Sequence, residues 1–562
     1  MSRRWAWMAF LSLLLGSCVQ PIASPAPEPT TTFTPFQPLV ESSQEPVEFT
    51  PAPMAAVEAT SSPQPQEEEA QSESPDTLAL WIDPALPASF RANLTLPTGY
   101  LPAASPKLAH VHLEPGAQAL VSQWVYAVVA PFPTLEQGVS STELRQAWSE
   151  GQAISPLLMD ENTFAFFTAL WGAPADGAVQ VLPAEQLLDY AWEQPHAWAL
   201  VPFEALQVGW KVLEVDGQSP LRNDFDLATY PLAAPISLVS AGEVALPPSD
   251  WLPHTNRRAD HLTVLALTGV TALVRATAYT MEQRGVTYPG KDVRDWLRQA
   301  DLTHISNEVP FASNCPYPDP DQRSMRFCSD PRYIKLLEDV GADIIELTGD
   351  HFQDWGREAM FLTLELYHER GWGYYGGGAD LEEAQRPLLV EHNGNRLAFI
   401  GCNAKGSGFA QAAPDRPGAV LCGDWLFDEI PRLRQKGYLP IVTFQHFEYY
   451  TYQAQSLQKR DFRKAARAGA VIVSGSQAHQ PQALELLDGS FIHYGLGNLF
   501  FDQYDVSKAC RQAFIDRHVF YEGRYIGVEL LPILFIDYAR PRPMTPDEAE
   551  DLLRTVFEAS GW

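Results

Sequence analysis

Residues 340–356 read VGADIIELTGDHFQDWG. The apolar run at 343–347 predicts a buried strand, and segment 333–340 before it predicts a helix. The strand gives way to a polar turn that contains Asp350 and His351. In open α/β sheets, ligand sites lie just beyond the carboxyl ends of the strands. This stretch therefore predicts an α/β fold with a functional site at a strand end.

The same pattern occurs three more times in the second half of the chain. Strands are predicted at 302–305, 441–444 and 471–473, and polar residues follow each of them: Ser306-Asn307-Glu308, Gln445-His446 and Gly475 to His479. An apolar strand and turn at 262–274 and a short helix at 293–297 complete the predicted alternation. Because these strand ends deliver Asp, Glu and His side chains, we expect them to form one site.

The first 77 residues have the composition of an export signal and a tether. Arg3 and Arg4 precede an apolar run that closes on Leu15-Gly16-Ser17-Cys18, which resembles a bacterial lipobox. We expect residues 1–18 to be a lipoprotein signal and Cys18 to be acylated. The alternative is an ordinary cleaved signal in which Cys18 is incidental. Residues 19–77 are rich in Pro, Ser, Thr and Glu and predict a disordered tether, so we expect an extracytoplasmic protein anchored to a membrane.

The chain of 562 residues has 39 Lys and Arg against 69 Asp and Glu, a formal net charge of −30. This balance argues against a nucleic-acid partner, because phosphates attract Lys and Arg. Ten acidic residues lie in 20–77, and 78–250 has 18 acidic residues against five basic ones. Most of the excess negative charge therefore lies before residue 251, outside the part of the chain that contains the predicted site.

Residues 78–250 predict a separate α/β domain. Strands are expected at 124–130, 197–203 and 210–215, and a helix begins after Ser140, which forms a capping box with Glu143. The pieces WVYAVVAPFPTLEQGVSSTELRQAW, WALVPFEAL and WKVLEVDGQSPL resemble a periplasmic solute-binding domain of the phosphate-binding type. The resemblance contains no ligand motif. A working receptor and a degenerate spacer or docking module are therefore both left open.

Cysteine usage agrees with an oxidising compartment. Cys315 and Cys328 flank a turn-rich segment and predict a local disulfide. Cys402 and Cys422 can pair likewise, which would leave Cys510 free. The sequence does not fix this connectivity. It contains no Cys-x-x-Cys pattern that would indicate structural zinc.

Residues 251–562 contain an ordered set of motifs. They read ADLTHISNEVPF, VGADIIELTGDHFQDWG, GGGADLEEAQRP, GNRLAFIGCN, FQHFEYY, AGAVIVSGSQAHQPQ and HYGLGNLFFD. This order resembles the CapA family, which is associated with poly-γ-glutamate capsule synthesis. The resemblance implies a metallophosphatase-like αββα sandwich with divalent metal (Mn, Zn or Fe) at the strand ends. It also implies capsule machinery and an anionic or glycan envelope polymer as partners.

The family's site residues are retained only in part. Glu308, Asp350, His351, His446 and His479 match metal-binding motifs, and Asn307, Arg275 and Asn498 match pocket positions. Two expected ligands are replaced, an Asp by Val270 and a His by Gln477. The matching residues still allow a single ion on Asp350, His446 and His479, with Glu308 as a further candidate ligand, and His351 would then protonate a leaving group or position an oxyanion. The opposing interpretation is a degenerate site without metal.

Three functions follow from these observations. The favoured one is a cell-surface lipoprotein of the CapA type that acts in capsule or envelope polymer synthesis as an accessory protein with a degenerate site. The first alternative is an active metal-dependent hydrolase on such a polymer. The second is an extracytoplasmic solute receptor, in which residues 78–250 would be dominant.

Overall fold

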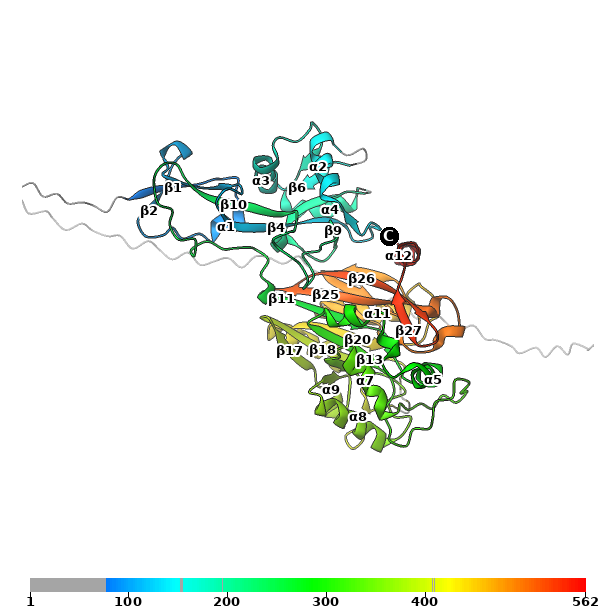
Figure 1. Ribbon diagram of the computed structural model, residues 1–562. Coiled ribbons are helices and arrows are strands. Elements are labelled where there is room, and N and C mark those ends of the chain that lie inside the picture. The colour runs from blue at the N-terminus through cyan, green and yellow to red at the C-terminus, as the bar shows by residue number, and fades with distance from the viewer. Residues whose placement is uncertain (1–76, 152–154, 195, 407, 409) are drawn as a thin grey trace, which may run out of the picture. The chain divides into compact units, whose positions relative to one another are not determined.

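A computed structural model describes residues 77–562 apart from 152–154, 195, 407 and 409. All described residues belong to one compact unit (Figure 1). The predicted signal, Cys18 and nearly all of the predicted tether lie outside the described residues. Within the described part, no helix combines the length and the apolar character that a bilayer crossing requires.

The first sheet has ten strands and is built by residues 78–240. Its main path runs β2, β1, β3, β10, β4, β8, β6, β7, and β9 pairs with β4 and β5. The strands are β1 (Leu78–Ile82), β2 (Tyr100–Pro102), β3 (Val111–Pro115), β4 (Leu120–Pro131), β5 (Gly138–Val139), β6 (Leu157–Met159), β7 (Val179–Val181), β8 (Ala199–Pro202), β9 (Trp210–Val215) and β10 (Ala233–Ser240). The predicted strands at 124–130, 197–203 and 210–215 correspond to β4, β8 and β9.

Four α-helices belong to the described residues of this first part, and one of them begins at the predicted capping box. They are α1 (Ala88–Ala92), α2 (Ser141–Glu150), α3 (Glu161–Trp171) and α4 (Leu187–Trp192). Helix α2 begins after Ser140, whose side chain accepts from the Glu143 backbone in the predicted capping box. Asp160 caps α3 in the same way.

A nine-stranded sheet forms the first layer of the second half. Its path runs β15, β14, β13, β11, β25, β26, β27, and β12 joins β13 to β24. The strands are β11 (Leu262–Thr268), β12 (Val270–Thr271), β13 (Leu302–Asn307), β14 (Ile344–Glu346), β15 (Gly373–Tyr375), β24 (Asn498–Phe500), β25 (Gln512–Tyr521), β26 (Arg524–Ile536) and β27 (Arg540–Pro543). Strands β11, β13, β14 and β15 are parallel, so the carboxyl ends of β13 and β14 meet at one edge.

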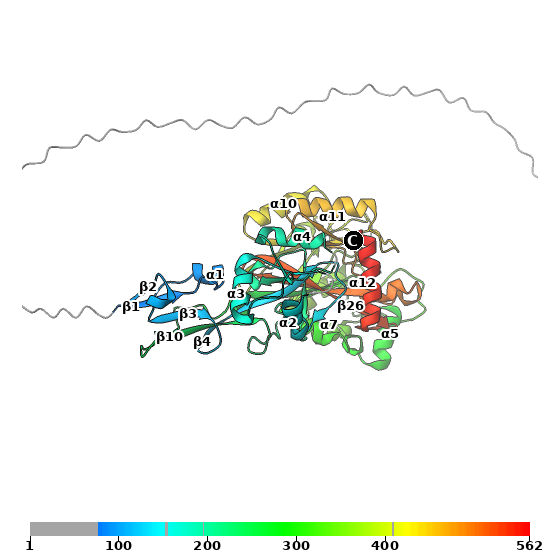
Figure 2. The same cartoon turned by 90° about the horizontal axis from the view of Figure 1, so that it is seen from above.

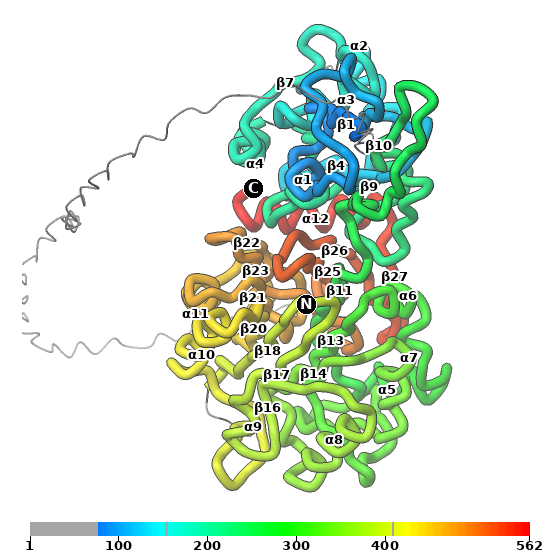
Figure 3. Tube along the Cα trace, turned by 90° about the vertical axis from the view of Figure 1, so that its left-hand side faces the viewer, coloured from blue at the N-terminus to red at the C-terminus, as the bar shows by residue number. Residues whose placement is uncertain are grey.

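A six-stranded sheet forms the second layer, with the order β17, β18, β20, β21, β23, β22 (Figure 3). The strands are β17 (Leu388–His392), β18 (Asn395–Asn403), β20 (Leu439–Gln445), β21 (Ile472–Ser474), β22 (Leu484–Leu487) and β23 (Ser490–His493). Strands β18, β20, β21 and β23 are parallel. A two-stranded ribbon of β16 (Gly377–Gly378) and β19 (Gly418–Ala419) is separate from both sheets.

The two sheets pack face to face between helices. One buried apolar cluster combines Leu265 and Phe514 of the nine-stranded sheet with Phe399, Ile441 and Ile472 of the six-stranded sheet. The helices are α5 (Arg275–Arg284), α6 (Arg294–Arg298), α7 (Ile334–Asp339), α8 (Arg357–Glu369), α9 (Leu381–Gln385), α10 (Asp424–Gln435), α11 (Ser456–Ala468) and α12 (Pro546–Ser560).

Each outer face of the two sheets is covered by its own helices. Met281 of α5, Leu297 of α6, Leu337 of α7 and Met360 of α8 share a core cluster with the nine-stranded sheet. Helices α10 and α11 lie side by side, as Figure 2 shows, and share a cluster with the six-stranded sheet. The predicted αββα sandwich is therefore confirmed.

Both cysteine pairs considered above are disulfides in the structure. Cys315 is bonded to Cys328, and Cys402 at the end of β18 is bonded to Cys422. Cys510 is a buried free thiol. The second bond holds the segment that follows β18, which bears on the site described below.

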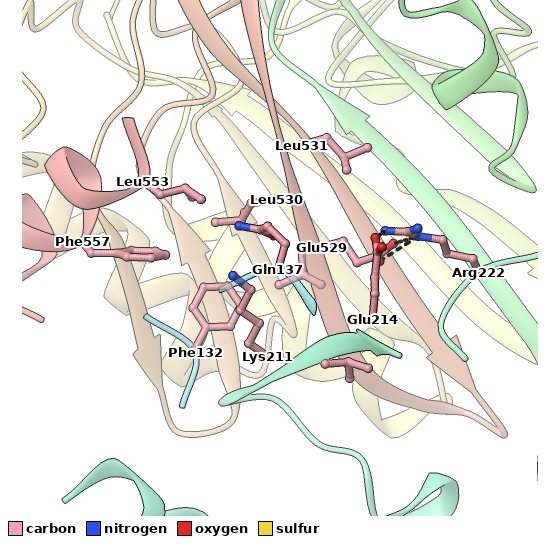
Figure 4. A pocket seen from close by; sticks show the side chains of 12 residues that line it. Phe132, Gln137, Lys211, Glu214, Arg222, Glu529, Leu530, Leu531, Leu553 and Phe557 are labelled. Atoms are coloured by element: carbon pink, nitrogen blue, oxygen red, sulfur yellow. Dashed lines mark hydrogen bonds and ion pairs between the residues drawn. The ribbon is translucent and has the colours of Figure 1, made fainter. Parts of the chain in front are cut away.

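A contact region joins β9 to β26 and α12. Phe132, Leu553 and Phe557 line its apolar side, and Figure 4 shows Arg222 paired with Glu214 and Glu529 on its charged side. The Arg222 Nε atom lies 3.0 Å from the Glu529 carboxylate. The enclosed cavity is only about 50 Å³, so this region serves as a packed joint and leaves little room for a ligand.

Lys211 lines the same joint and predicts a pH-dependent stability. Burial lowers the pKa of its ammonium to about 8, against the opposing effect of Glu136 and Glu214. Its Nζ donates to the Thr134 carbonyl at 2.6 Å. In the unfolded chain this lysine stays protonated up to its ordinary pKa near 10.5. Below pH 8 the folded lysine is protonated too, so the full free-energy cost of burying its charge lowers the stability of the folded state.

Lys211→Met should therefore raise the free energy of unfolding at pH 7 by about 1–3 kcal/mol. We expect this gain to shrink as the pH rises from about 8 towards 10.5, where the wild-type lysine also folds without a penalty. Urea unfolding of both proteins across this pH range measures the difference. A gain that does not change with pH would contradict the assignment, because it would reflect packing alone.

Candidate functional site

The carboxyl ends of β13 and β14 bring together Glu308, Asp350 and His351. Ligand atoms of these three residues lie within 4.8 Å of one another. Glu308 is buried, with 2% of its surface exposed, and its backbone N–H donates to the Thr271 carbonyl at 2.9 Å. Gly349 permits the close approach of the two turns, since a Cβ there would lie 2.9 Å from the Glu308 Cα.

Lys405 lies at the centre of the site, although it is not among the residues predicted from the sequence. It follows β18, and its Nζ lies 2.7 Å from Asp350 Oδ2 and 2.8 Å from Glu448 Oε1. The other Asp350 oxygen accepts a hydrogen bond from Gln445 Nε2 at 2.8 Å. Extending the strand-end rule to the FIGCN strand would have pointed to Lys405, two residues beyond Asn403.

His446 and His479 are buried and are not members of the group formed by Glu308, Asp350 and His351. His446 Nε2 contacts Asp461 of α11 at 3.2 Å, and its Nδ1 has no hydrogen-bond partner. His479 Nδ1 lies 2.9 Å from the Asn498 amide oxygen, while its Nε2 is 3.8 Å from Glu448. Burial lowers the pKa of both imidazoles, which keeps them neutral.

The two replaced ligand positions make packing and hydrogen-bond contacts instead. Val270 is fully buried and belongs to an apolar cluster with Phe327 and Phe501. Gln477 donates through Nε2 to Ser306 Oγ at 2.7 Å, and its Oε1 has no partner. The Gln477–Ser306 hydrogen bond connects the turn after β21 to the end of β13 across the two sheets.

Asn307, Asn498 and Arg275 support the site from its flanks. Asn307 donates to the Val309 carbonyl and to the Tyr367 hydroxyl. Asn498 donates to the His479 carbonyl at 3.1 Å and so fixes that turn. The Asn307 and Asn498 side-chain amides are thus held by hydrogen bonds to backbone carbonyls and to the Tyr367 hydroxyl.

Arg275 pairs with Asp502, with its Nε 2.9 Å from the carboxylate. Its guanidinium also lies over the rings of Phe327 and Phe501, which in turn contact His351 and His479 respectively. Arg275 has a φ of 45°, an uncommon value for a residue with a Cβ. We interpret it as a positioning residue of the site.

Charge pairing determines the protonation of the site. Burial raises the pKa of Glu308 well above its usual range, although His351 and Lys405 oppose the effect. Burial alone would lower the pKa of His351, but Asp354, 2.7 Å from its Nδ1, and the nearby carboxylates raise it to about 9. Lys405 lowers the pKa of Asp350 despite burial, and those carboxylates in turn raise the pKa of Lys405. At neutral pH the site contains its own positive charges.

The donor set does not fit the two-ion centre of a metallophosphoesterase. Such a centre needs carboxylate and imidazole donors around both ions. In the described part of the chain, the group of at least three residues close enough to share an ion is Glu308, Asp350 and His351. The predicted grouping of Asp350 with His446 and His479 stays a prediction, and in the structure one nitrogen of each imidazole contacts another side chain, Asp461 or Asn498. Both oxygens of Asp350 are already engaged.

Two packed sheets between helices, with acidic and imidazole side chains at the strand ends, define an αββα sandwich with a polar site at one edge of its sheets. Residues 264–503 match the family model described as "Bacterial capsule synthesis protein PGA_cap". Through these residues the chain is similar to capsule synthesis proteins of the CapA type.

Two curated relatives and one solved structure are similar to parts of the chain. The PGA biosynthesis protein CapA of Bacillus subtilis is 26% identical over 300 residues, which cover 52% of this chain and 77% of the relative. A "Probable polyglutamine synthesis accessory protein" of Mycobacterium tuberculosis is 24% identical over 259 residues, 43% of this chain and 68% of the relative. The NAD nucleotidase of Haemophilus influenzae is 8% identical, covers 52% of this chain and 56% of that one, and has a TM-score of 0.29.

Proposed function

We propose that this protein is an accessory protein in the synthesis of a capsule polymer of the poly-γ-glutamate type. It acts outside the cytoplasm, where a lipid attached to Cys18 anchors it to the membrane. The observation that supports the proposal most is the family match over 264–503, which includes all four predicted strand ends. One relative has biosynthesis of PGA in its name, and another is named a synthesis accessory protein.

The altered donor set favours an accessory role over metal-dependent hydrolysis. Val270 has no donor atom, and Gln477 is turned to Ser306. Lys405 supplies a positive charge between Asp350 and Glu448, where a hydrolase of this fold would use an ion. Partners of the accessory role would be the polymer and its synthesis machinery. A role in solute binding for residues 78–250 has no ligand motif to support it.

Deletion of the gene in its host tests this function. We expect the cell-associated capsule fraction of the deletion strain to lose most of its polymer. Glutamate released by acid hydrolysis measures a glutamate polymer, and the sugars of the same fraction measure a glycan polymer. The full-length gene should restore the polymer, and a Cys18→Ala gene should restore less of it because the protein would leave the membrane. The control is Glu550→Ala, which removes one carboxylate of an exposed surface pair. Unchanged glutamate and sugar in the deletion strain would overturn the proposal.

A further inference from the structure

Lys405 links three strand ends that belong to both sheets of the sandwich. Asp350 follows β14 of the nine-stranded sheet, whereas Glu448 follows β20 and Lys405 follows β18 of the six-stranded sheet. The ammonium lies within 2.8 Å of both carboxylates. The three side chains are only partly exposed, at 23% for Lys405, 30% for Asp350 and 29% for Glu448.

Two carboxylates from opposite sheets repel each other unless a cation lies between them. A metallophosphoesterase satisfies this requirement with metal ions. In this chain the remaining contacts leave little coordination capacity. Asp350 uses its second oxygen for Gln445, and the second oxygen of Glu448 accepts from the Tyr450 hydroxyl at 3.2 Å. The ammonium of Lys405 therefore satisfies both carboxylates without an ion.

The loop geometry supports a fixed position for this cation. The Lys405 backbone N–H donates to Asn403 Oδ1 at 2.9 Å, and Asn403 Nδ2 donates to the Thr348 carbonyl at 3.0 Å. The Cys402–Cys422 disulfide restrains the same segment. Lys405 is thus tied by its own backbone to the turn that presents Asp350, which reduces the entropy lost when its side chain is ordered.

We propose that the Lys405 ammonium is a tethered replacement for the divalent ion of this fold, and that it makes the site independent of metal. Its removal should convert the site into a divalent-cation site, because Asp350 and Glu448 would lose their internal cation while Glu308 and His351 stay nearby. The proposal concerns the chemistry of the site and does not depend on the role in capsule synthesis.

Isothermal titration of the purified full-length protein with Mn²⁺ tests this inference. We expect Lys405→Met to bind about one equivalent of Mn²⁺ at least tenfold more tightly than the wild type. Lys405→Arg keeps the positive charge and should not gain binding. Lys464→Met is the matched control, because it removes a lysine from another carboxylate pair, with Asp424 on the surface. Adding Asp350→Asn to Lys405→Met should abolish the gained binding.

A second measurement keeps the test decisive if Lys405→Met is unstable. Millimolar Mn²⁺ should then raise the melting temperature of Lys405→Met and leave that of the wild type unchanged, because the ion would replace the missing ammonium. Two outcomes would overturn the proposal. One is a wild-type protein that binds stoichiometric Mn²⁺ and loses it on Asp350→Asn. The other is a Lys405→Met protein that shows neither tighter binding nor stabilisation by Mn²⁺.

Discussion

Gly475→Ala is expected to lower the free energy of unfolding by about 3 kcal/mol or more. A Cβ at Gly475 would lie 2.0 Å from the Tyr494 carbonyl oxygen, far inside van der Waals contact. The backbone cannot retreat easily, because the Gly475 N–H donates to the His493 carbonyl at 2.8 Å. Gly475 also begins the turn that carries Gln477 and His479, so its displacement would distort the site.

Urea unfolding followed by tryptophan fluorescence measures this loss. Gly242→Ala is the matched control, since a Cβ there meets no atom within 4 Å. The control should change the free energy of unfolding by no more than about 0.5 kcal/mol. Equal effects of the two substitutions would show that the turn after β21 yields to a methyl group, and would refute the close approach.

The same reasoning explains a glycine that precedes a lost ligand. A Cβ at Gly269 would lie 1.9 Å from the Gly497 carbonyl oxygen, which accepts a hydrogen bond from the Val270 N–H at 3.0 Å. Gly269 is therefore required by the contact between β12 and the segment before β24. Packing demands this glycine whether or not the next residue binds a metal, so its presence beside Val270 is no sign of an intact metal centre.

The strand ends could be predicted from the sequence because they depend on local patterns. The apolar runs ending before Asn307, Asp350 and His446 became β13, β14 and β20 with shifts of only one or two residues. Parallel pairing then placed these ends at common edges, as expected for α/β sheets. The two replaced ligands were also visible, since Val has no donor atom and Gln cannot act as an imidazole.

The contacts within the site could not be predicted in the same way. Lys405 belongs to no motif, and its pairing with Asp350 and Glu448 depends on the approach of two sheets. His446 lies in the expected strand-end position, but its ring contacts Asp461, 15 residues later on α11. Such orientations are set by tertiary contacts between distant segments, and sequence spacing does not encode them.

A buried polar network between the sheets was also outside the reach of pattern analysis. His304 Nε2 lies 2.8 Å from the Tyr375 hydroxyl, which is 3.0 Å from Thr443 of the facing sheet. Glu346 is fully buried and accepts from Thr348 at 2.6 Å. Most of these residues lie on strands whose sequences are mainly apolar, so the sequence pattern gives no sign that their polar side chains contact one another. These hydrogen bonds satisfy one ring nitrogen of His304 and one carboxylate oxygen of Glu346, while His304 Nδ1 and Glu346 Oε2 are buried without a hydrogen-bond partner.

Glu529→Ala should lower the free energy of unfolding by about 3 kcal/mol, because it leaves the buried Arg517 without its carboxylate and removes one of the two carboxylates paired with Arg222. Glu529 on β26 accepts from Arg222 at 3.0 Å and from Arg517 on β25 at 3.3 Å. The Arg517 side chain is only 4% exposed. Arg222 also pairs with Glu214 on β9, so Glu529 connects the ten-stranded sheet to the nine-stranded one (Figure 4).

The control for this prediction is the exposed pair Glu550–Arg554, whose side chains are 54% and 53% exposed. Glu550→Ala should change stability by less than about 1 kcal/mol, because solvent screens that pair. A double-mutant cycle of Glu529→Ala with Arg222→Ala then isolates the coupling across the joint. If urea unfolding of Glu529→Ala matches Glu550→Ala, the buried carboxylate does not stabilise the joint. A large coupling energy between Glu529 and Arg222 would instead show that the ten-stranded and nine-stranded sheets unfold as one unit. If the two sheets unfolded independently, a contact between them would add little to the stability of each sheet.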